Sequence, residues 1–222
     1  MNFINLGLPS GTCWGECNIL AATPTEFGGF FSYRALMNPS SVESAHFIQL
    51  RGFDPRTGYP AIAALPLKDM LRMIGSLAFC VPSQEQMKEL ISCCDWKLVS
   101  PKGVWGFKST SRYNGKSIFF PMAGRLPDRI VKEMSLVQSS YDLGYLTENE
   151  RFNHLLDLES YAKKDKKHCC QYLTRSTDPR FLPLGWNGGA NALTIKASLS
   201  EPLAQIIPVS RDLWLPIRPV LN

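Results

Sequence analysis

The chain reads Asn114-Gly115-Lys116-Ser117-Ile118-Phe119-Phe120-Pro121-Met122-Ala123-Gly124 at the stretch that decides its fold. Asn-Gly between two strand-forming runs is a strong signal for a type I′ β-hairpin. The run before it covers residues 105–110, and the run after it covers residues 116–120. The sequence therefore predicts two antiparallel strands whose register is fixed by the turn.

Two helices are predicted, one on each side of this hairpin. Upstream, Ser83 and Gln86 have the spacing of a capping box. The residues that follow them on one helical face are Met87, Leu90, Ile91 and Cys94. Downstream, Thr147 and Glu150 have the same spacing. The residues that follow them on one face are Phe152, Leu155, Leu156 and Glu159. The second helix should end in the lysine-rich residues 163–167, which complement its dipole in solvent.

Short strands are predicted near both ends of the chain. Residues 6–18 contain a Pro-Ser-Gly turn between apolar stretches, which indicates a hairpin-like start to a sheet with Trp14 in the core. Residues 27–33 combine glycines with aromatics, as in a strand beside a close backbone approach. Residues 38–65 have weak periodicity and many turn formers, so we expect a long connection with little regular structure.

The C-terminal region also alternates as strands do, over residues 192–197 and 213–218. Pro216 and Pro219 require an edge strand or a bulge, because proline cannot donate to a β-ladder. The chain is 45% hydrophobic and has 16 glycines and 16 prolines, which suits a loop-rich globular fold. These patterns together predict an α+β protein.

Charge and hydropathy disfavour several classes of partner. The net charge of +5 is modest and the basic residues are dispersed, apart from residues 163–167, so nucleic acid is not an expected partner. No apolar run approaches the roughly 20 residues of a spanning helix, and we expect no membrane insertion. The first residues lack the pattern of a signal peptide, so none is expected.

The seven cysteines are an odd number. The adjacent pairs Cys93-Cys94 and Cys169-Cys170 do not suit a disulfide framework. Free, largely buried thiols are the expectation. A bridge from Cys17 to Cys94 stays open for a protein that ends in an oxidising medium.

The sequence carries no pattern typical of a catalytic or metal centre. His46, His154 and His168 are not accompanied by a Gly-x-Ser-x-Gly nucleophile elbow, so we expect no hydrolase triad and no enzyme activity. The contiguous His168-Cys169-Cys170 does not suit the usual closed zinc geometry. We expect neither a metal nor a cofactor.

Several phrases spread along the chain match one known pattern. They are Leu6-Gly7-Leu8-Pro9-Ser10-Gly11-Thr12-Cys13-Trp14 with Cys17-Asn18; Phe27-Gly28-Gly29-Phe30-Phe31-Ser32-Tyr33; Val81-Pro82-Ser83 through Leu90 with Cys94-Asp95-Trp96; Gly115 through Gly124; and, at the end, Tyr172-Leu173-Thr174-Arg175-Ser176 and Ile217-Arg218-Pro219-Val220. With these phrases the chain resembles the Fibrobacter succinogenes major paralogous domain family, often shortened to FISUMP.

The resemblance implies a single C-type-lectin-like domain over residues 1–222, with insertions near residues 38–79 and 125–168. Such a fold would pack two helices on a small, mostly antiparallel, loop-rich sheet. Members of the family are displayed on Bacteroidetes cells or carried by their phages, generally as ligand-binding or adhesive modules. The chain departs from the family at Tyr33-Arg34-Ala35, where Trp-Gly-Glu is usual.

Calcium-dependent lectins of this fold use Glu-Pro-Asn and Trp-Asn-Asp phrases. The chain has only Glu201-Pro202-Leu203 and Trp186-Asn187-Gly188, which lack the carboxylates that hold a hard cation. Residues 172–194 instead mix aromatic, guanidinium and amide groups, as recognition surfaces do. The alternative is a set of ordinary loops. The expected ligand-binding residues are Tyr172, Arg175, Thr177, Arg180, Phe181, Trp186, Asn187 and Asn191.

The sequence thus favours a non-catalytic binding or adhesion module. We expect a bacteriophage virion protein that recognises a protein or glycan on a bacterial surface, or neighbouring virion proteins, because a family found outside the cell is combined here with no expected leader. One alternative is a secreted or lipid-anchored Bacteroidetes adhesin, which would be extracellular. Another is a structural capsid or tail decoration protein. Formylglycine-generating enzymes share the broader fold, but no cysteine here has plausible catalytic partners. Self-association as a homo-oligomer is left open.

Overall fold

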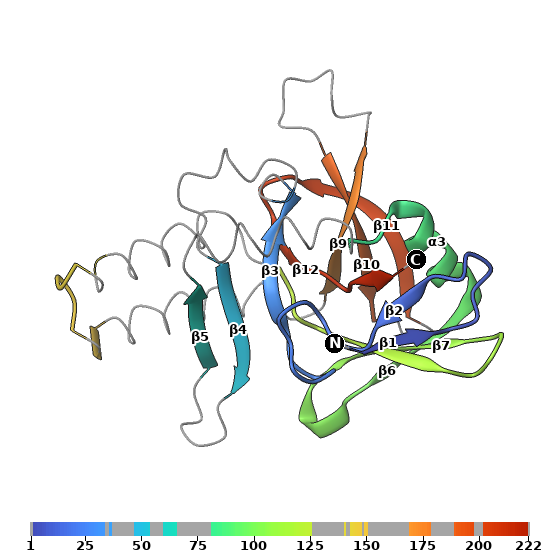
Figure 1. Ribbon diagram of the computed structural model, residues 1–222, viewed down its shortest axis with the longest axis horizontal. Helices are drawn as coiled ribbons and strands as arrows, with labels where there is room; N and C mark the ends of the chain where they lie inside the picture. Colours follow the sequence, from blue (N-terminus) through green and yellow to red (C-terminus); the bar gives the residue numbers. More distant parts are fainter. Residues whose placement is uncertain are drawn as a thin grey trace.

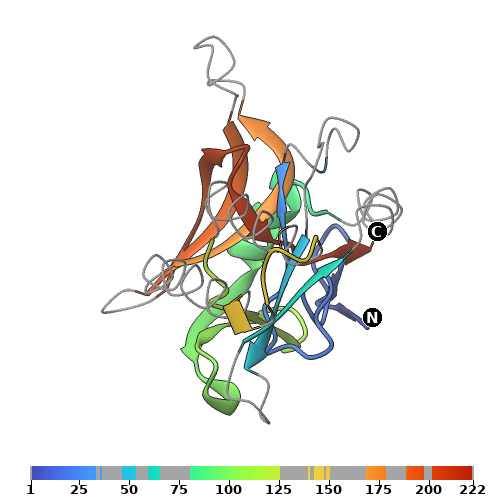
Figure 2. The ribbon, with the colours of Figure 1, turned by 90° about the vertical axis from the view of Figure 1, so that its left-hand side faces the viewer.

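Four antiparallel sheets and one helix make up the part of the chain that the structure describes, so the protein is a sheet-rich α+β protein. The structure, a computed structural model, describes residues 2–33, 36, 47–53, 60–65, 81–125, 140, 143–147, 149–150, 169–178, 189–197 and 202–221. Figures 1 and 2 show how these elements are arranged in space.

The two ends of the chain meet in one small sheet. β1 (Phe3–Asn5) and β13 (Val220–Leu221) both pair antiparallel with β2 (Cys13–Gly15), which lies between them. The two termini accordingly lie near each other in both views (Figures 1 and 2). The hairpin-like start predicted over residues 6–18 is confirmed for β2, but its first strand, β1, lies before the predicted range. Trp14 is fully buried as expected.

A second sheet has the strand order β12-β3-β4-β5. Its members are β12 (Trp214–Pro216), β3 (Gly28–Ser32), β4 (Phe47–Phe53) and β5 (Pro60–Leu65). The expectation of little regular structure over residues 38–65 is therefore wrong for the β4–β5 hairpin. β5 is a short apolar run, which periodicity alone does not assign to an element type. β4 mixes apolar residues with Gln49, Arg51 and Gly52 over only seven residues.

The predicted close backbone approach beside β3 is confirmed at Gly28. Its φ is +72°, and a Cβ atom there would lie 2.3 Å from the carbonyl oxygen of Ile19. The amide of Gly29 donates to the same oxygen at 2.8 Å. Only glycine suits this position, because it needs both the left-handed conformation and the missing side chain.

We predict that Gly28→Ala destabilises the protein more than Gly11→Ala does. Both glycines have a φ of +72°, but no heavy atom lies within 4 Å of a Cβ at Gly11. Gly11→Ala should lower the free energy of unfolding by about 1–2 kcal/mol through its conformation alone. Gly28→Ala should lower it by about 1–3 kcal/mol more, because backbone must move. Urea unfolding measures both, and equal losses would contradict the close approach.

The first predicted helix is confirmed as α3 (Gln84–Cys93), with its capping box formed. The Ser83 hydroxyl accepts from the amide of Gln86 at 3.2 Å, and the Gln86 side chain accepts from the amide of Ser83 at 2.8 Å. Met87 and Leu90 are fully buried. The helix therefore lays its apolar face on the core, as the sequence predicts.

α3 packs on a three-stranded sheet of order β11-β10-β9. The strands are β9 (Cys169–Asp178), β10 (Gly189–Lys196) and β11 (Leu203–Ser210). Hydrogen bonds dock the start of the helix on β9: the amide of Gln84 donates to the Ser176 hydroxyl at 3.0 Å. The strand predicted over residues 192–197 is thus the central strand of this sheet.

Only the start of the second predicted helix lies within the described residues. Its capping box is present, because the amide of Glu150 donates to the Thr147 hydroxyl at 3.3 Å and the Glu150 carboxylate accepts from the amide of Thr147 at 2.9 Å. The rest of that helix and the lysine-rich residues 163–167 lie outside the described part. The expected pair of helices is therefore shown for α3 alone.

The hairpin that decides the fold is present, but its turn is not of type I′. β7 (Gly106–Ser111) pairs antiparallel with β8 (Ser117–Pro121). A type I′ turn needs a positive φ at both central residues, and among residues 112–115 only Gly115 has one. The predicted strands are confirmed, and the predicted turn type is wrong.

The side chain of Asn114 accounts for the different turn. It accepts from the amide of Lys116 at 3.0 Å and donates to the carbonyl of Asn5 at 3.1 Å. The amide of Ser111 donates to the carbonyl of Lys116 at 2.8 Å and closes the loop. A longer loop thus replaces the two-residue turn and ties the hairpin to β1.

The remaining strand of this sheet is β6 (Cys94–Val99), which follows α3 directly and pairs with β7. The inner face of the sheet, α3, β9 and β10 enclose the hydrophobic core. Its buried members are Leu6, Leu8, Trp14, Met87, Leu90, Cys94, Phe107, Ile118, Phe120, Cys170, Tyr172, Leu193, Ile195 and Val220.

Five cysteines of the described part form no disulfide, as the sequence predicts: Cys13, Cys17, Cys93, Cys94 and Cys170. The structure therefore contains no bridge between Cys17 and Cys94. Burial raises the pKa of both of these thiols. Because the thiolate is the reactive form, these two cysteines should be poor nucleophiles at neutral pH.

Candidate functional site

The two faces of the β6–β7–β8 sheet differ in chemistry. On the inner face, Phe107 and Phe120 are fully buried in the core. On the outer face, the strand register places Lys97, Lys108 and Phe119 in one row across the three strands. Because side chains alternate between the faces of a strand, this row lies on the side of the sheet away from the core.

The Phe119 ring is held against the backbone of Gly106. A Cβ atom at Gly106 would lie 2.4 Å from Phe119 Cζ and 2.4 Å from the carbonyl oxygen of Phe120. The missing side chain thus makes room for the ring. An aromatic side chain that covers a glycine on a neighbouring strand is a recognised device for pinning sheet register. The position of the Phe119 ring is therefore fixed by its packing on Gly106.

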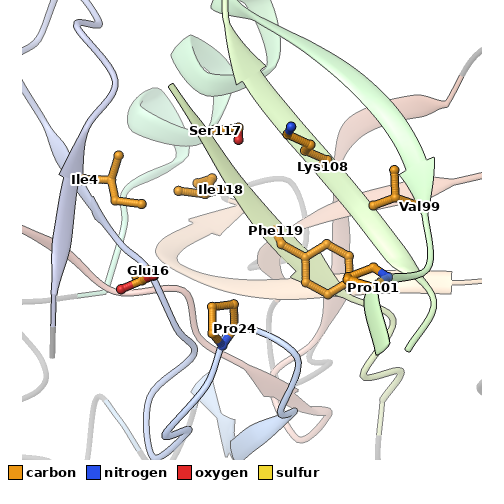
Figure 3. Close-up of a pocket in the computed structure, with 9 residues that line it drawn as sticks. All are labelled: Ile4, Glu16, Pro24, Val99, Pro101, Lys108, Ser117, Ile118 and Phe119. Carbon is orange, nitrogen blue, oxygen red and sulfur yellow. The ribbon is translucent and has the colours of Figure 1, made fainter. Parts of the chain in front are cut away.

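A groove of about 450 Å³ opens beside this ring, between the outer face of the sheet and the first part of the chain (Figure 3). Its lining is mainly apolar. The residues that line it are Ile4, Glu16, Pro24, Val99, Pro101, Lys108, Ser117, Ile118 and Phe119. Its size and apolar walls are those of a small-ligand site.

The charged groups of the groove are separated from each other. Figure 3 shows Lys108 and Glu16 on different sides of the opening. Glu16 accepts a hydrogen bond from the Asn2 side chain at 3.2 Å. Within the described part, no hydrogen bond joins Lys108 to the Ser117 hydroxyl. The groove therefore presents its positive and its negative side chain at separate places along its opening.

The Arg218 guanidinium hydrogen-bonds to the backbone on both sides of the groove. Its side chain is fully buried. One Nη donates to the carbonyls of Gly15 at 3.2 Å and of Glu16 at 2.6 Å, and the other Nη donates to the carbonyl of Phe119. Since Glu16 and Phe119 both line the groove, one guanidinium sets the distance between its walls.

Within the described part of the chain, no carboxylate bonds to Arg218, so carbonyl dipoles and the Phe120 ring balance its charge. The guanidinium carbon lies 5.0 Å from the centroid of the Phe120 ring, which is a cation–π distance. Burial lowers the pKa of Arg218, while the nearby Tyr172 phenol acts in the opposite direction. The group stays protonated, since arginine does not lose its proton in proteins.

We predict that Arg218→Met lowers the free energy of unfolding by about 3–5 kcal/mol, because three carbonyls lose a buried, charged donor. Arg218→Lys should also destabilise, since an ammonium cannot reproduce the planar fork that reaches separate carbonyls. Arg175→Met is the matched control, because Arg175 is exposed, and it should change stability by less than about 0.5 kcal/mol. Urea unfolding that gave the same small loss for both methionine variants would contradict this role of Arg218.

The structure places the predicted ligand-binding residues in different environments. Tyr172 is fully buried: its hydroxyl donates to the carbonyl of Pro121 at 3.0 Å and accepts from Asn18 at 3.3 Å. Burial raises the pKa of its phenol. Asn191 is 4% exposed and donates to Gln84 at 3.1 Å. These two side chains hold the core and the helix start, so their assignment to a recognition surface is corrected.

Two other predicted residues remain available at the surface. Arg175 is exposed and Thr177 is half-buried, both on β9. The remaining four lie outside the described residues: Arg180, Phe181, Trp186 and Asn187. The four predicted residues that the structure describes therefore do not form one exposed site, because Tyr172 and Asn191 are buried.

The groove was not predicted from the sequence. Its walls come from parts of the chain about a hundred residues apart, at Glu16 and Phe119. The signal that was available lies in the β7–β8 hairpin, whose register pairs Lys108 with Phe119 and puts Gly106 beside the ring. The sequence could thus have predicted the side of the groove formed by Lys108 and Phe119, but not the facing side at Glu16.

Comparisons with known proteins give no relative for the chain: no family model, no curated protein and no solved structure matches it. Among the described residues, no helix is long and apolar enough to cross a membrane. The same residues contain no group of three or more His, Cys, Asp or Glu side chains placed to hold a metal ion.

Proposed function

We propose that this protein is a non-catalytic binding module with a C-type-lectin-like fold, which serves in a bacteriophage virion to recognise a bacterial surface ligand. The observation that carries the proposal is the groove beside Phe119. It is apolar, open to solvent and bounded by an aromatic ring that the backbone of Gly106 positions. Preformed pockets of this kind are the usual sites of ligand binding.

Three features of the structure support the fold part of the proposal. β1 and β13 both pair with β2, so segments more than 200 residues apart meet in one small antiparallel sheet. α3 packs on a three-stranded antiparallel sheet. Arg218, Gly28 and the β8 strand, which belong to phrases resembling the FISUMP family, each have a structural role here. The coarse arrangement therefore suits a C-type-lectin-like domain.

The cysteines support assembly in a reducing compartment before release. Cys17 and Cys94 are buried, and neither forms a disulfide. Structural disulfides are usual in small proteins that fold outside the cytosol, whereas free buried thiols are usual in proteins that fold inside it. A virion that assembles in the cytoplasm and leaves by lysis fits this state better than a secreted adhesin does.

The binding function is tested with fluorescently labelled protein on a panel of Bacteroidetes strains. We expect saturable binding to a subset of strains, and a loss of binding of at least about tenfold with Phe119→Ala, which removes the groove wall. Tyr113→Ala is the matched control, because Tyr113 is 60% exposed and does not line the groove. Thermal unfolding of each variant confirms that it is folded.

Three outcomes would contradict the proposal. Absence of the chain from purified phage particles, measured by mass spectrometry, would remove the virion role. Equal binding by wild type, Phe119→Ala and Tyr113→Ala would show that the groove does not recognise the ligand. Failed particle assembly with Phe119→Ala, without any cell binding by the wild type, would favour a structural decoration protein instead.

A further inference from the structure

The outer row of the β6–β7–β8 sheet places two positive charges next to each other. Lys97 and Lys108 are directly paired across β6 and β7, and both side chains are exposed. Like charges at directly opposed positions on one sheet face destabilise the pair. Within the described part of the chain, neither lysine has a carboxylate in ion-pair contact. Their charges are therefore available to a ligand.

These lysines lie at one side of the apolar groove. Lys108 lines the groove itself, and it is the direct cross-strand neighbour of Phe119. Lys97 is the next residue in the same row. An anion beside Lys108 would thus interact with both ammonium groups and would relieve their mutual repulsion. Its apolar part would rest on the ring and on the aliphatic wall.

Glu16 gives one end of the groove a negative charge, opposite in sign to the lysine end. Its carboxylate lies on a different side of the opening from Lys108 (Figure 3), and the Asn2 side chain holds it at 3.2 Å. A negative group is repelled at this end and attracted at the lysine end. The remaining lining offers few polar groups: the Ser117 hydroxyl is its one uncharged polar side chain. A ligand with many hydroxyls is therefore a poor match for the walls.

We propose that the groove binds a small organic anion, in which one acidic group is carried on an apolar aryl or acyl body. The acidic group lies against Lys108 and Lys97, and the apolar body packs on Phe119. This inference rests on the proposed binding function, because it names the ligand class of the same groove. Because the lysine ammonium group is a compact point charge, it binds a carboxylate, a sulfonate or a phosphate group alike.

Two fluorescent probes with a shared aromatic body test the inference. 1-Anilinonaphthalene-8-sulfonate carries an anionic group, and N-phenyl-1-naphthylamine lacks it. We expect Lys108→Met to weaken binding of the sulfonate by at least about fivefold and to change binding of the neutral probe by less than about twofold. Lys97→Met should have a smaller effect in the same direction, and added salt should weaken only the sulfonate.

Lys88→Met is the control for net charge, because Lys88 is exposed on α3 and does not line the groove. It should leave both probes unaffected. Phe119→Leu should weaken both probes, which locates them in the groove. Excess 4-phenylbutyrate should displace the sulfonate, and the uncharged 4-phenyl-1-butanol should displace it far less.

The inference would be overturned if Lys108→Met left sulfonate binding unchanged, or weakened both probes equally. Cell binding by the labelled protein is measured separately. Cell binding without charge discrimination between the probes would overturn the ligand class alone. If Lys108→Met weakened only sulfonate binding, but the protein neither bound cells nor was present in phage particles, the proposed function alone would be overturned.

Discussion

The structure depends most on one buried guanidinium. Arg218 comes from the last residues of the chain, and it donates to carbonyls near the start, at Gly15 and Glu16, and in the middle, at Phe119. A buried cation is unfavourable unless its donors are satisfied. Both Nη groups of Arg218 have carbonyl partners, whereas its Nε has none among the described residues. The side chain therefore stabilises one arrangement of three distant segments. The pairing of β13 with β2 places it there, and the Phe120 ring covers one of its faces.

This constraint explains why a groove can exist on the outer face of the sheet. Apolar side chains at a surface tend to collapse on each other, but the two walls here belong to segments whose backbones are fixed by the same donor group. Gly106 fixes the Phe119 ring from the other side. The binding surface is thus preorganised, and preorganised sites lose little entropy when a ligand binds. Recognition and stability are linked through residues that do not contact the ligand.

The sequence predicted best the features that arise from local chemistry. The capping residues predicted the start of α3, and the glycines of residues 27–33 predicted the close backbone approach at Gly28. Pro216 was predicted to lie in an edge strand or at a bulge, and it lies in the edge strand β12. The turn type was wrong because Asn114 bonds to the distant Asn5, which local propensity ignores. The β4–β5 hairpin was missed because β5 is an apolar run without a clear period and β4 is short and lies among turn-forming residues.

The candidate site depended on long-range contacts, so little of it could be predicted. Tyr172 resembled a recognition residue by type, but its place on the inner face of β9 made it part of the core. The most direct test of the account is NMR of the arginine side chains at neutral pH. We predict separate, slowly exchanging Nη resonances for Arg218 and averaged ones for Arg175. Rapidly averaged Nη resonances for Arg218 would contradict a guanidinium fixed between both walls.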